Sequence, residues 1–181
     1  MPPSSFFYLV LRGINMLPLD YVVFDIETTG FTPNYAEIIE IGALKCRNAE
    51  ITDEFHSYIC PDCGYIPRAI TNLTGITYSM VCDSPGFEDA VPAFIEFVGN
   101  MPVVGHNVRF DMRFIQTYAR ACSWDFDPSD VIDTVPLARK KIKDIPNHKL
   151  ETIKQYFDID LPSHNALDDC RVTQYLFEYC R

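Results

Sequence analysis

The sequence predicts an α/β protein whose helices pack in layers around a mixed β-sheet. Apolar runs with strand character come first, and helical segments then alternate with short strands, which is the pattern of such layered folds. The 181 residues contain no repeat, low-complexity stretch or linker that would divide them, and this length suits one domain.

The composition is that of a globular protein, with 48% hydrophobic and 22% charged residues, and it argues against a disordered or fibrous chain. No apolar run approaches the roughly 20 residues of a membrane span, so no membrane partner is expected. The seven cysteines lie scattered in core-like segments, which favours a reducing cytoplasm over a secreted disulfide framework. A net charge of −10 means that a nucleic-acid partner needs a local basic patch or a metal bridge. The oligomeric state stays open.

Residues 1–18 are interpreted as an N-terminal extension that precedes a domain over residues 19–181. The apolar run Phe6–Leu11 has six residues and no basic segment before it, whereas a signal peptide carries an apolar region of about 7–15 residues. Met16 stands just before the first strand, so residues 1–15 are an upstream start or an extension.

The first half of the domain contains three predicted strands and two predicted helices. The first strand is β-branched and aromatic and is bounded by Asp25 and a turn at Thr29-Gly30. The next two strands are expected to be antiparallel neighbours. The strands are Tyr21–Phe24, Glu37–Cys46 and Asp53–Cys60, and the helices are Pro67–Leu73 and the amphipathic Phe87–Val98.

The second half alternates short strands with helices. Val103-Val104 forms a strand that ends at Gly105, and Asn107 is expected to be the N-cap of a helix that runs to about Ala121. Another short strand follows at 131–132, and the remaining helices are Val135–Lys143, Lys149–Phe157 and Ala166–Tyr179.

Two acids follow the first buried strand directly. The two-residue period of a strand puts the side chains of Asp25 and Glu27 on one face, about 6.5–7 Å apart. Two neighbouring anions repel each other unless a cation lies between them. A solvated polar strand end is the alternative.

A third acid lies on the apolar side of the helix after Asn107. The buried stripe of this helix comprises Val108, Ile115, Ala119 and Cys122. The opposite face carries Arg109, Arg113, Gln116 and Arg120. Asp111 falls on the apolar stripe, where a lone carboxylate is costly unless it is paired or binds metal. A salt bridge to a nearby arginine is the alternative.

The last helix begins with two adjacent acids. Asp168 falls on the solvated face, where it can pair with Arg171 at i, i+3. Asp169 shares the inner face with Val172 and Leu176, so helical phase selects Asp169 as the inward acid. His164 precedes this helix in a loop. It is either a catalytic residue or a surface or capping residue.

Four inward acids and a histidine predict a two-metal site. Oxygen-only ligands, here Asp25, Glu27, Asp111 and Asp169, select Mg²⁺ or Mn²⁺ rather than Zn²⁺. Two such ions roughly 3.5–4 Å apart can clamp a phosphodiester, one activating water and the other stabilising the leaving oxygen. His164 would take the proton from the attacking water.

Three motifs carry a family resemblance. VVFDIETTG, VGHNVRFDMRFI and HNALDDCRVT resemble, in order, the motifs of DEDDh-type 3′–5′ exonucleases such as the epsilon subunit of bacterial DNA polymerase III. They would supply Asp25 and Glu27, then Asp111, then His164 with Asp169. The segments ITNLTGIT, DTVPLAR and HKLETI also resemble the family, and the match covers residues 19–178.

The resemblance implies a ribonuclease H-like fold with a mixed five-stranded sheet. It implies release of nucleoside 5′-monophosphates from the 3′ end of single-stranded or frayed DNA or RNA. Thr28 and Gly30 are expected to bring backbone near the terminal nucleotide, and Leu73 with Ile76 to pack against its base or sugar. Two further expected substrate contacts are Asn107 and Phe110. Ordinary turn and core roles are the alternative for these residues.

Two local features depart from or add to this pattern. Cys60-Pro-Asp-Cys63-Gly64 resembles half of a zinc knuckle, and a zinc ion there would be structural. A basic cluster is expected to hold phosphates of a single strand, or else to be a solvated helix face. It comprises Arg139, Lys140, Lys141, Lys143 and Lys149.

Other functions remain alternatives at this point. A nucleic-acid-binding module of the same fold without catalysis is one, and a two-metal phosphoesterase for small substrates is another. The chain ends at Arg181 without a long tail for a polymerase partner, which favours a stand-alone enzyme or a separately made domain. The choice between DNA and RNA is open, because the metal chemistry is the same for both.

Overall fold

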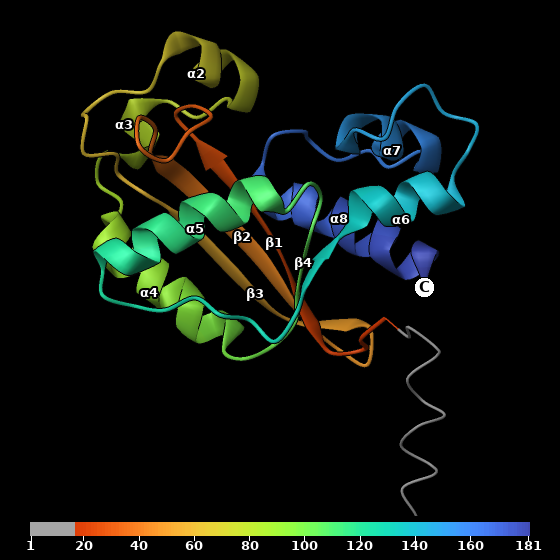
Figure 1. Ribbon diagram of the computed structural model, residues 1–181. Helices are drawn as coiled ribbons and strands as arrows, with labels where there is room; N and C mark the ends of the chain where they lie inside the picture. The colour runs from red at the N-terminus through yellow and green to blue at the C-terminus, as the bar shows by residue number, and fades with distance from the viewer. Residues whose placement is uncertain (1–16) are drawn as a thin grey trace, which may run out of the picture.

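The computed structural model describes residues 17–181 and contains a five-stranded sheet with helices on both faces (Figure 1). The strand order is β3-β2-β1-β4-β5, with β1, β2 and β3 antiparallel and with β4 and β5 parallel to β1. The sheet is therefore mixed, as predicted. The strands are β1 (Tyr21–Thr28), β2 (Ile38–Arg47), β3 (Glu50–Tyr58), β4 (Val103–Gly105) and β5 (Val131–Asp133).

The predicted helices are all present, and one short helix was not predicted. This helix, α3, has four residues, which is too short to show a helical period in the sequence. The helices are α2 (Arg68–Thr74), α3 (Tyr78–Val81), α4 (Phe87–Val98), α5 (Arg109–Ala121), α6 (Thr134–Lys141), α7 (Leu150–Phe157) and α8 (Ala166–Cys180).

The first strand is longer than predicted, because it continues from Phe24 through Thr28. β2 pairs along this whole length, so that Asp25 lies opposite Gly42 and Glu27 lies opposite Glu40. The backbone hydrogen bonds of this ladder keep the segment extended although its side chains are acidic. The two acids therefore lie within the strand instead of after it.

The expected N-cap at Asn107 is also wrong. α5 begins at Arg109, and the residue before it is Val108. Asn107 has a φ of 63°, and its amide donates to Oδ1 of Asp133 at 3.0 Å. The side chain of Asp133 also accepts from the amide of Val135 at 2.9 Å, which makes it the cap of α6. Asp133 thus fixes the chain just before α5 and the start of α6 together.

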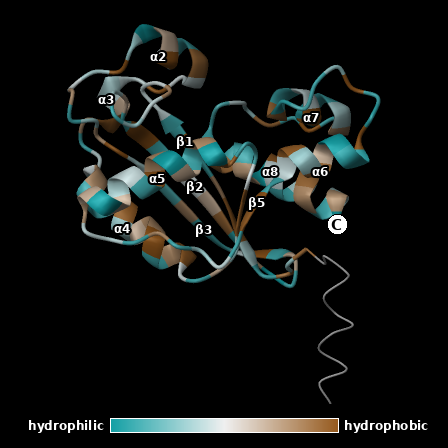
Figure 2. Ribbon diagram, viewed as in Figure 1, coloured by the Kyte–Doolittle hydropathy of each residue, from teal (hydrophilic) through white to brown (hydrophobic). Residues whose placement is uncertain are grey.

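Alternate residues of β1 pack on opposite faces of the sheet. Val22, Phe24 and Ile26 join the core beneath α4 and α5, and Tyr21 and Val23 pack under α8. Figure 2 shows that the helices around the sheet carry both hydrophobic and hydrophilic residues. Burying a side chain as large as Phe24 contributes about 1.5–3 kcal/mol. Since the side-chain period is two, the acids that follow in β1 face α8.

The predictions for residues 1–15 and for the run Phe6–Leu11 lie outside the described residues. Within residues 17–181, no helix has the length and apolar character needed to cross a membrane. The seven cysteines are free thiols.

Candidate active site

The four predicted acids come from three elements that meet near one end of the sheet. Asp25 and Glu27 lie on β1, Asp111 lies in the first turn of α5, and Asp169 lies in the first turn of α8. The amide of Ile26 donates to Oδ1 of Asp111 at 3.3 Å, which ties α5 to β1. Asp111 and Asp169 are buried, with 4% and 8% of their surfaces exposed. Carboxylates this deep require compensation.

His164 lies beside two of these acids, Glu27 and Asp169. Ligand atoms of Glu27, His164 and Asp169 all lie within 4.8 Å of one another, and within residues 17–181 no other group of acids, histidines or cysteines gathers so closely. The backbone amide of His164 donates to Oδ2 of Asp169 at 3.1 Å. The φ of His164 is 59°, so a left-handed residue turns the chain into α8. The structure thus brings together side chains that are far apart in the sequence.

The pKa values of all four acids are raised. Burial raises the pKa of Asp25 well above its usual range, and the neighbouring charges of Asp111 and Asp169 raise it further. Burial is also the largest cause at Glu27 and Asp111, where it raises each pKa to about 8. The pKa of Asp169 rises to about 6, because burial outweighs the hydrogen bond from the His164 amide. A cation between these groups would relieve both the desolvation and the repulsion.

This donor set fits a hard divalent cation. Carboxylate oxygens from Asp25, Glu27, Asp111 and Asp169 are the ligands that Mg²⁺ and Mn²⁺ prefer. The alternative of an arginine partner for Asp111 is not realised, because no ion pair of the described residues includes it.

Asp168 lies outside this cluster, as helical phase predicts. It is partly exposed, and its amide donates to Oδ1 of Asn165, the N-cap of α8, at 3.0 Å. The expected pair with Arg171 does not form. Arg171 instead contacts the carboxylate of Glu54 on β3 at 2.7 Å, since the sheet offers an acid on that side.

The expected substrate contacts differ in what they offer to a ligand. The hydroxyl of Thr28 donates to the carbonyl of Gly30 at 2.6 Å, so it is used within the turn. Leu73 on α2 is half-exposed, whereas Ile76 is 3% exposed and packs with Ile39 and Val81. For Ile76 the structure therefore favours the alternative of a core residue.

The other two expected contacts lie at the start of α5. Asn107 is exposed; its backbone amide donates to Asp133, and its carbonyl accepts from the amide of Phe110 at 3.1 Å. Phe110 is partly buried, and its ring lies 5.1 Å from that of Phe114.

The cysteine loop does not belong to the group of ligand atoms formed by Glu27, His164 and Asp169. The thiol of Cys63 faces the carbonyl of Tyr65, and that of Cys60 faces the carbonyl of Pro61. All five residues of the basic cluster are exposed, on α6 and in the segment between α6 and α7. The side chain of Lys143 donates back to the carbonyl of Arg139 at 2.6 Å.

Two buried charged residues near the site were not predicted. Glu40 is fully buried near the start of β2, and Lys154 on α7 is 6% exposed. A signal for Glu40 was present in the sequence, because it is the one charged residue in the apolar run IIEIGAL. Lys154 binds the segment that precedes α8, and Glu40 binds the N-cap and the first residue of this helix.

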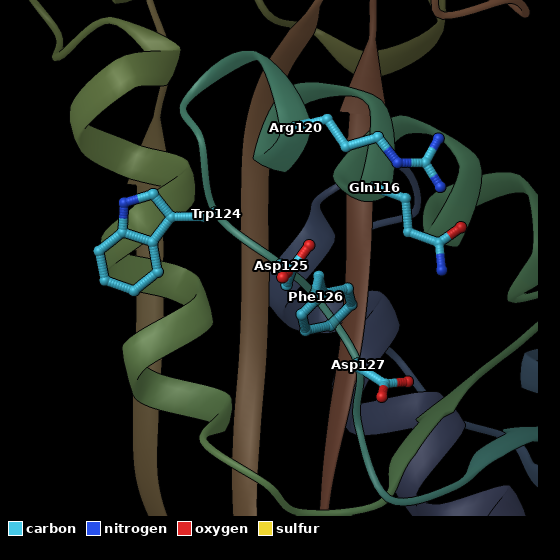
Figure 3. Close-up of a pocket in the computed structure, with 6 residues that line it drawn as sticks. All are labelled: Gln116, Arg120, Trp124, Asp125, Phe126 and Asp127. Carbon is cyan, nitrogen blue, oxygen red and sulfur yellow. The ribbon is translucent and has the colours of Figure 1, made fainter.

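A cavity of about 270 Å³ lies beside the C-terminal half of α5 (Figure 3). Its walls come from α5 and the chain that follows α5, and they are Gln116, Arg120, Trp124, Asp125, Phe126 and Asp127. Arg120 is nine residues beyond Asp111, which is about 13 Å along a helix. The acids and His164 do not line this cavity.

Comparison with known protein families identifies the class of this domain as an exonuclease. A family model described as "Exonuclease" (RNase T) matches residues 22–177, and the chain therefore belongs to this family. The family resemblance of the three motifs is thus confirmed.

Two curated relatives are DNA polymerase III enzymes of the PolC type. The one from Caldanaerobacter subterraneus subsp. tengcongensis is 40% identical over 159 residues, and the one from Clostridium perfringens is 41% identical over 161 residues. These matches cover 87% and 88% of this chain and 11% of each relative. The chain thus spans about a tenth of the length of these polymerases.

Solved structures confirm the ribonuclease H-like fold. Exonuclease X in complex with 5′-overhanging duplex DNA is 25% identical, with a TM-score of 0.70 and coverage of 88% of this chain and 90% of that one. E. coli Exonuclease I in complex with a dA16 oligonucleotide is 18% identical, with a TM-score of 0.74 and coverage of 90% and 40%.

Proposed function

We propose that this chain is a metal-dependent 3′–5′ exonuclease that releases nucleoside 5′-monophosphates from single-stranded or frayed 3′ ends. The observation that carries the proposal is the convergence of Glu27, His164 and Asp169. The partly buried Asp25 and the buried Asp111 lie beside them. A carboxylate cluster with raised pKa values at the end of a sheet is suited to charged phosphodiesters only when cations neutralise it.

The chain's own residues have separate roles in this proposal. Asp25, Glu27, Asp111 and Asp169 would hold two Mg²⁺ or Mn²⁺ ions, which supply charge neutralisation and polarisation of the phosphodiester. A ring nitrogen of His164 lies within 4.8 Å of the carboxylate oxygens of Glu27 and Asp169. Because the four acids would hold the metal ions, the imidazole is available to accept a proton from water. The buried position of Asp111 and Asp169 keeps their carboxylates fixed while substrate binds.

DNA is the substrate class that the relatives favour. The curated relatives at about 40% identity are DNA polymerases, and Exonuclease X, at 25% identity, was solved with duplex DNA. If this chain acts beside a polymerase, its role would be proofreading. The exposed basic cluster, which lies on α6 and in the segment after it, would hold phosphates upstream of the scissile bond.

Labelled oligonucleotides test the proposal. A 3′-labelled single strand should release labelled mononucleotide in the first turnover, and a 5′-labelled strand should give a ladder of shortening products, both only with Mg²⁺ or Mn²⁺. DNA and RNA versions of each strand establish the sugar preference. Release of mononucleotide from the 5′ label first would overturn the polarity. Binding without any hydrolysis would instead identify a catalytically silent module.

A further inference from the structure

Glu40 connects the centre of the sheet to the start of α8. Its Oε1 accepts from Nε2 of His56 at 2.8 Å and from Nδ2 of Asn165 at 3.3 Å, and its Oε2 accepts from the amide of Ala166 at 3.2 Å. Asn165 and Ala166 are the N-cap and the first residue of α8. A fully buried carboxylate thus accepts three hydrogen bonds, two of them from the residues that follow His164 directly.

The register of the sheet places this anchor beside the active site. Glu40 is the cross-strand partner of Glu27 in the β1–β2 ladder, so the anchor and the metal-binding acid lie next to each other. Gly42, two residues further along the same face of β2, permits the close approach of α8. A Cβ on Gly42 would lie 2.5 Å from the carbonyl carbon of Ala166 and 2.6 Å from the amide nitrogen of Leu167. The backbone of the first turn of α8 therefore packs directly against β2.

The same loop is held on its other side by Lys154. The ammonium group of this buried lysine donates to the hydroxyl of Ser163 at 2.7 Å and to the carbonyl of Leu161. His164 lies between the segment bound by Lys154 and the segment bound by Glu40. Side chains held from both sides keep one geometry, and catalysis depends on such geometry.

We propose that Glu40 is a positioning residue, which holds His164 and Asp169 against Glu27 by anchoring the first turn of α8 to β2. The proposal rests on the exonuclease function proposed above. It does not make Glu40 a metal ligand, because both carboxylate oxygens are already engaged by the three donors.

Glu40→Gln tests the anchor. Glutamine has one acceptor oxygen, so its NH₂ group must face at least one of the three N–H donors, and the helix start is released. The single-turnover rate at saturating Mg²⁺ should fall by about 10²-fold, the cost of a small misplacement of catalytic groups. Affinity for a 3′-ended oligonucleotide should stay near that of the wild type. Hydrogen exchange at the amides of His164 and Ala166 should become faster.

Two further variants control for folding. Val91→Ala removes buried volume from α4, on the opposite face of the sheet, and should lower the melting temperature while leaving turnover and exchange at residues 164–166 unchanged. Asn165→Ser keeps an oxygen that can cap α8 but removes the donor to Glu40. It should show the same pattern as Glu40→Gln in weaker form, and it keeps the test decisive if Glu40→Gln fails to fold.

The outcomes separate this inference from the proposed function. If Glu40→Gln reaches the wild-type rate once Mg²⁺ is raised above the concentration that saturates the wild type, Glu40 acts only through its charge and the positioning role is wrong. Unchanged exchange at His164 and Ala166 would also overturn it, whatever the activity. If replacing His164 itself leaves turnover unchanged, the proposed proton acceptor fails, and faster exchange in Glu40→Gln would still establish the anchor.

Discussion

The backbone amide of His164 donates to Oδ2 of Asp169, so the proposed proton acceptor and a proposed metal ligand share one turn. The left-handed conformation of His164 makes this contact possible, with a φ of 59°. A β-carbon is strained in that region, and asparagine tolerates it better than most residues do. His164→Asn therefore removes the imidazole with less disturbance of the turn than His164→Ala.

Removal of the imidazole should reduce turnover and leave substrate binding intact. His164→Asn should lower the single-turnover rate by about 10²–10⁴-fold, the usual contribution of a positioned base. Oligonucleotide affinity should stay near that of the wild type, because the four acids remain. Single-turnover kinetics and equilibrium binding measure the two effects separately. A variant that fails only through weaker metal binding would make His164 a structural residue.

Asp25→Ala should abolish hydrolysis without unfolding the protein. Asp25 lies among the charges of Asp111, Asp169 and Glu27, so its removal relieves repulsion in the metal-free state. We expect an equal or higher melting temperature than that of the wild type without metal, together with loss of activity at millimolar Mg²⁺. Substantial remaining activity would remove Asp25 from the set of ligands.

Stability of the metal-free protein should fall as pH rises. The pKa values of Glu27 and Asp111 are about 8 and that of Asp169 is about 6, so the folded state binds more protons than the unfolded chain above about pH 4. The contribution of these groups to the free energy of unfolding is complete below about pH 4. It decreases as pH rises to about 8 and does not change above that pH. Denaturant titrations of wild type and Asp25→Asn should show a weaker pH dependence in the variant.

Divalent cations should reverse this loss. Mg²⁺ or Mn²⁺ binds the ionised carboxylates of the folded state, so the rise in melting temperature on adding metal should be larger at pH 8 than at pH 5. Thermal melts at the two pH values, with and without metal, measure the difference. A shift that is independent of pH would mean that the metal binds elsewhere.

His56 should stabilise the protein more strongly at acidic pH. Its hydrogen bond to Glu40 raises its pKa above the usual 6.5, so its stabilising effect is complete below that value and is lost as pH rises through the folded-state pKa. His56→Gln keeps a donor for Glu40 but cannot be charged. The difference in unfolding free energy between wild type and His56→Gln should therefore be larger at pH 5.5 than at pH 8.

Local patterns were enough to predict most of the fold and the identity of the acids. Period-two alternation placed Asp25 and Glu27 on one face, and helical phase separated Asp169 from Asp168, because both depend only on neighbours in the chain. The length of β1 and the start of α5 were not predictable in this way. Pairing with β2 extends the strand through its acids. The hydrogen bond from the backbone amide of Asn107 to Asp133 holds Asn107 outside the helix.

The sequence by itself determined the class of fold, the three acidic motifs and the family. Only the tertiary structure decided which charges lie together. Glu40 enters the site because the register of β2 places it opposite Glu27, and Lys154 enters because α7 packs beside the loop that carries His164. Such contacts join residues up to 126 positions apart, as in the pair of Glu40 and Ala166. No local pattern specifies them, since they arise from burial of separate apolar faces against one sheet.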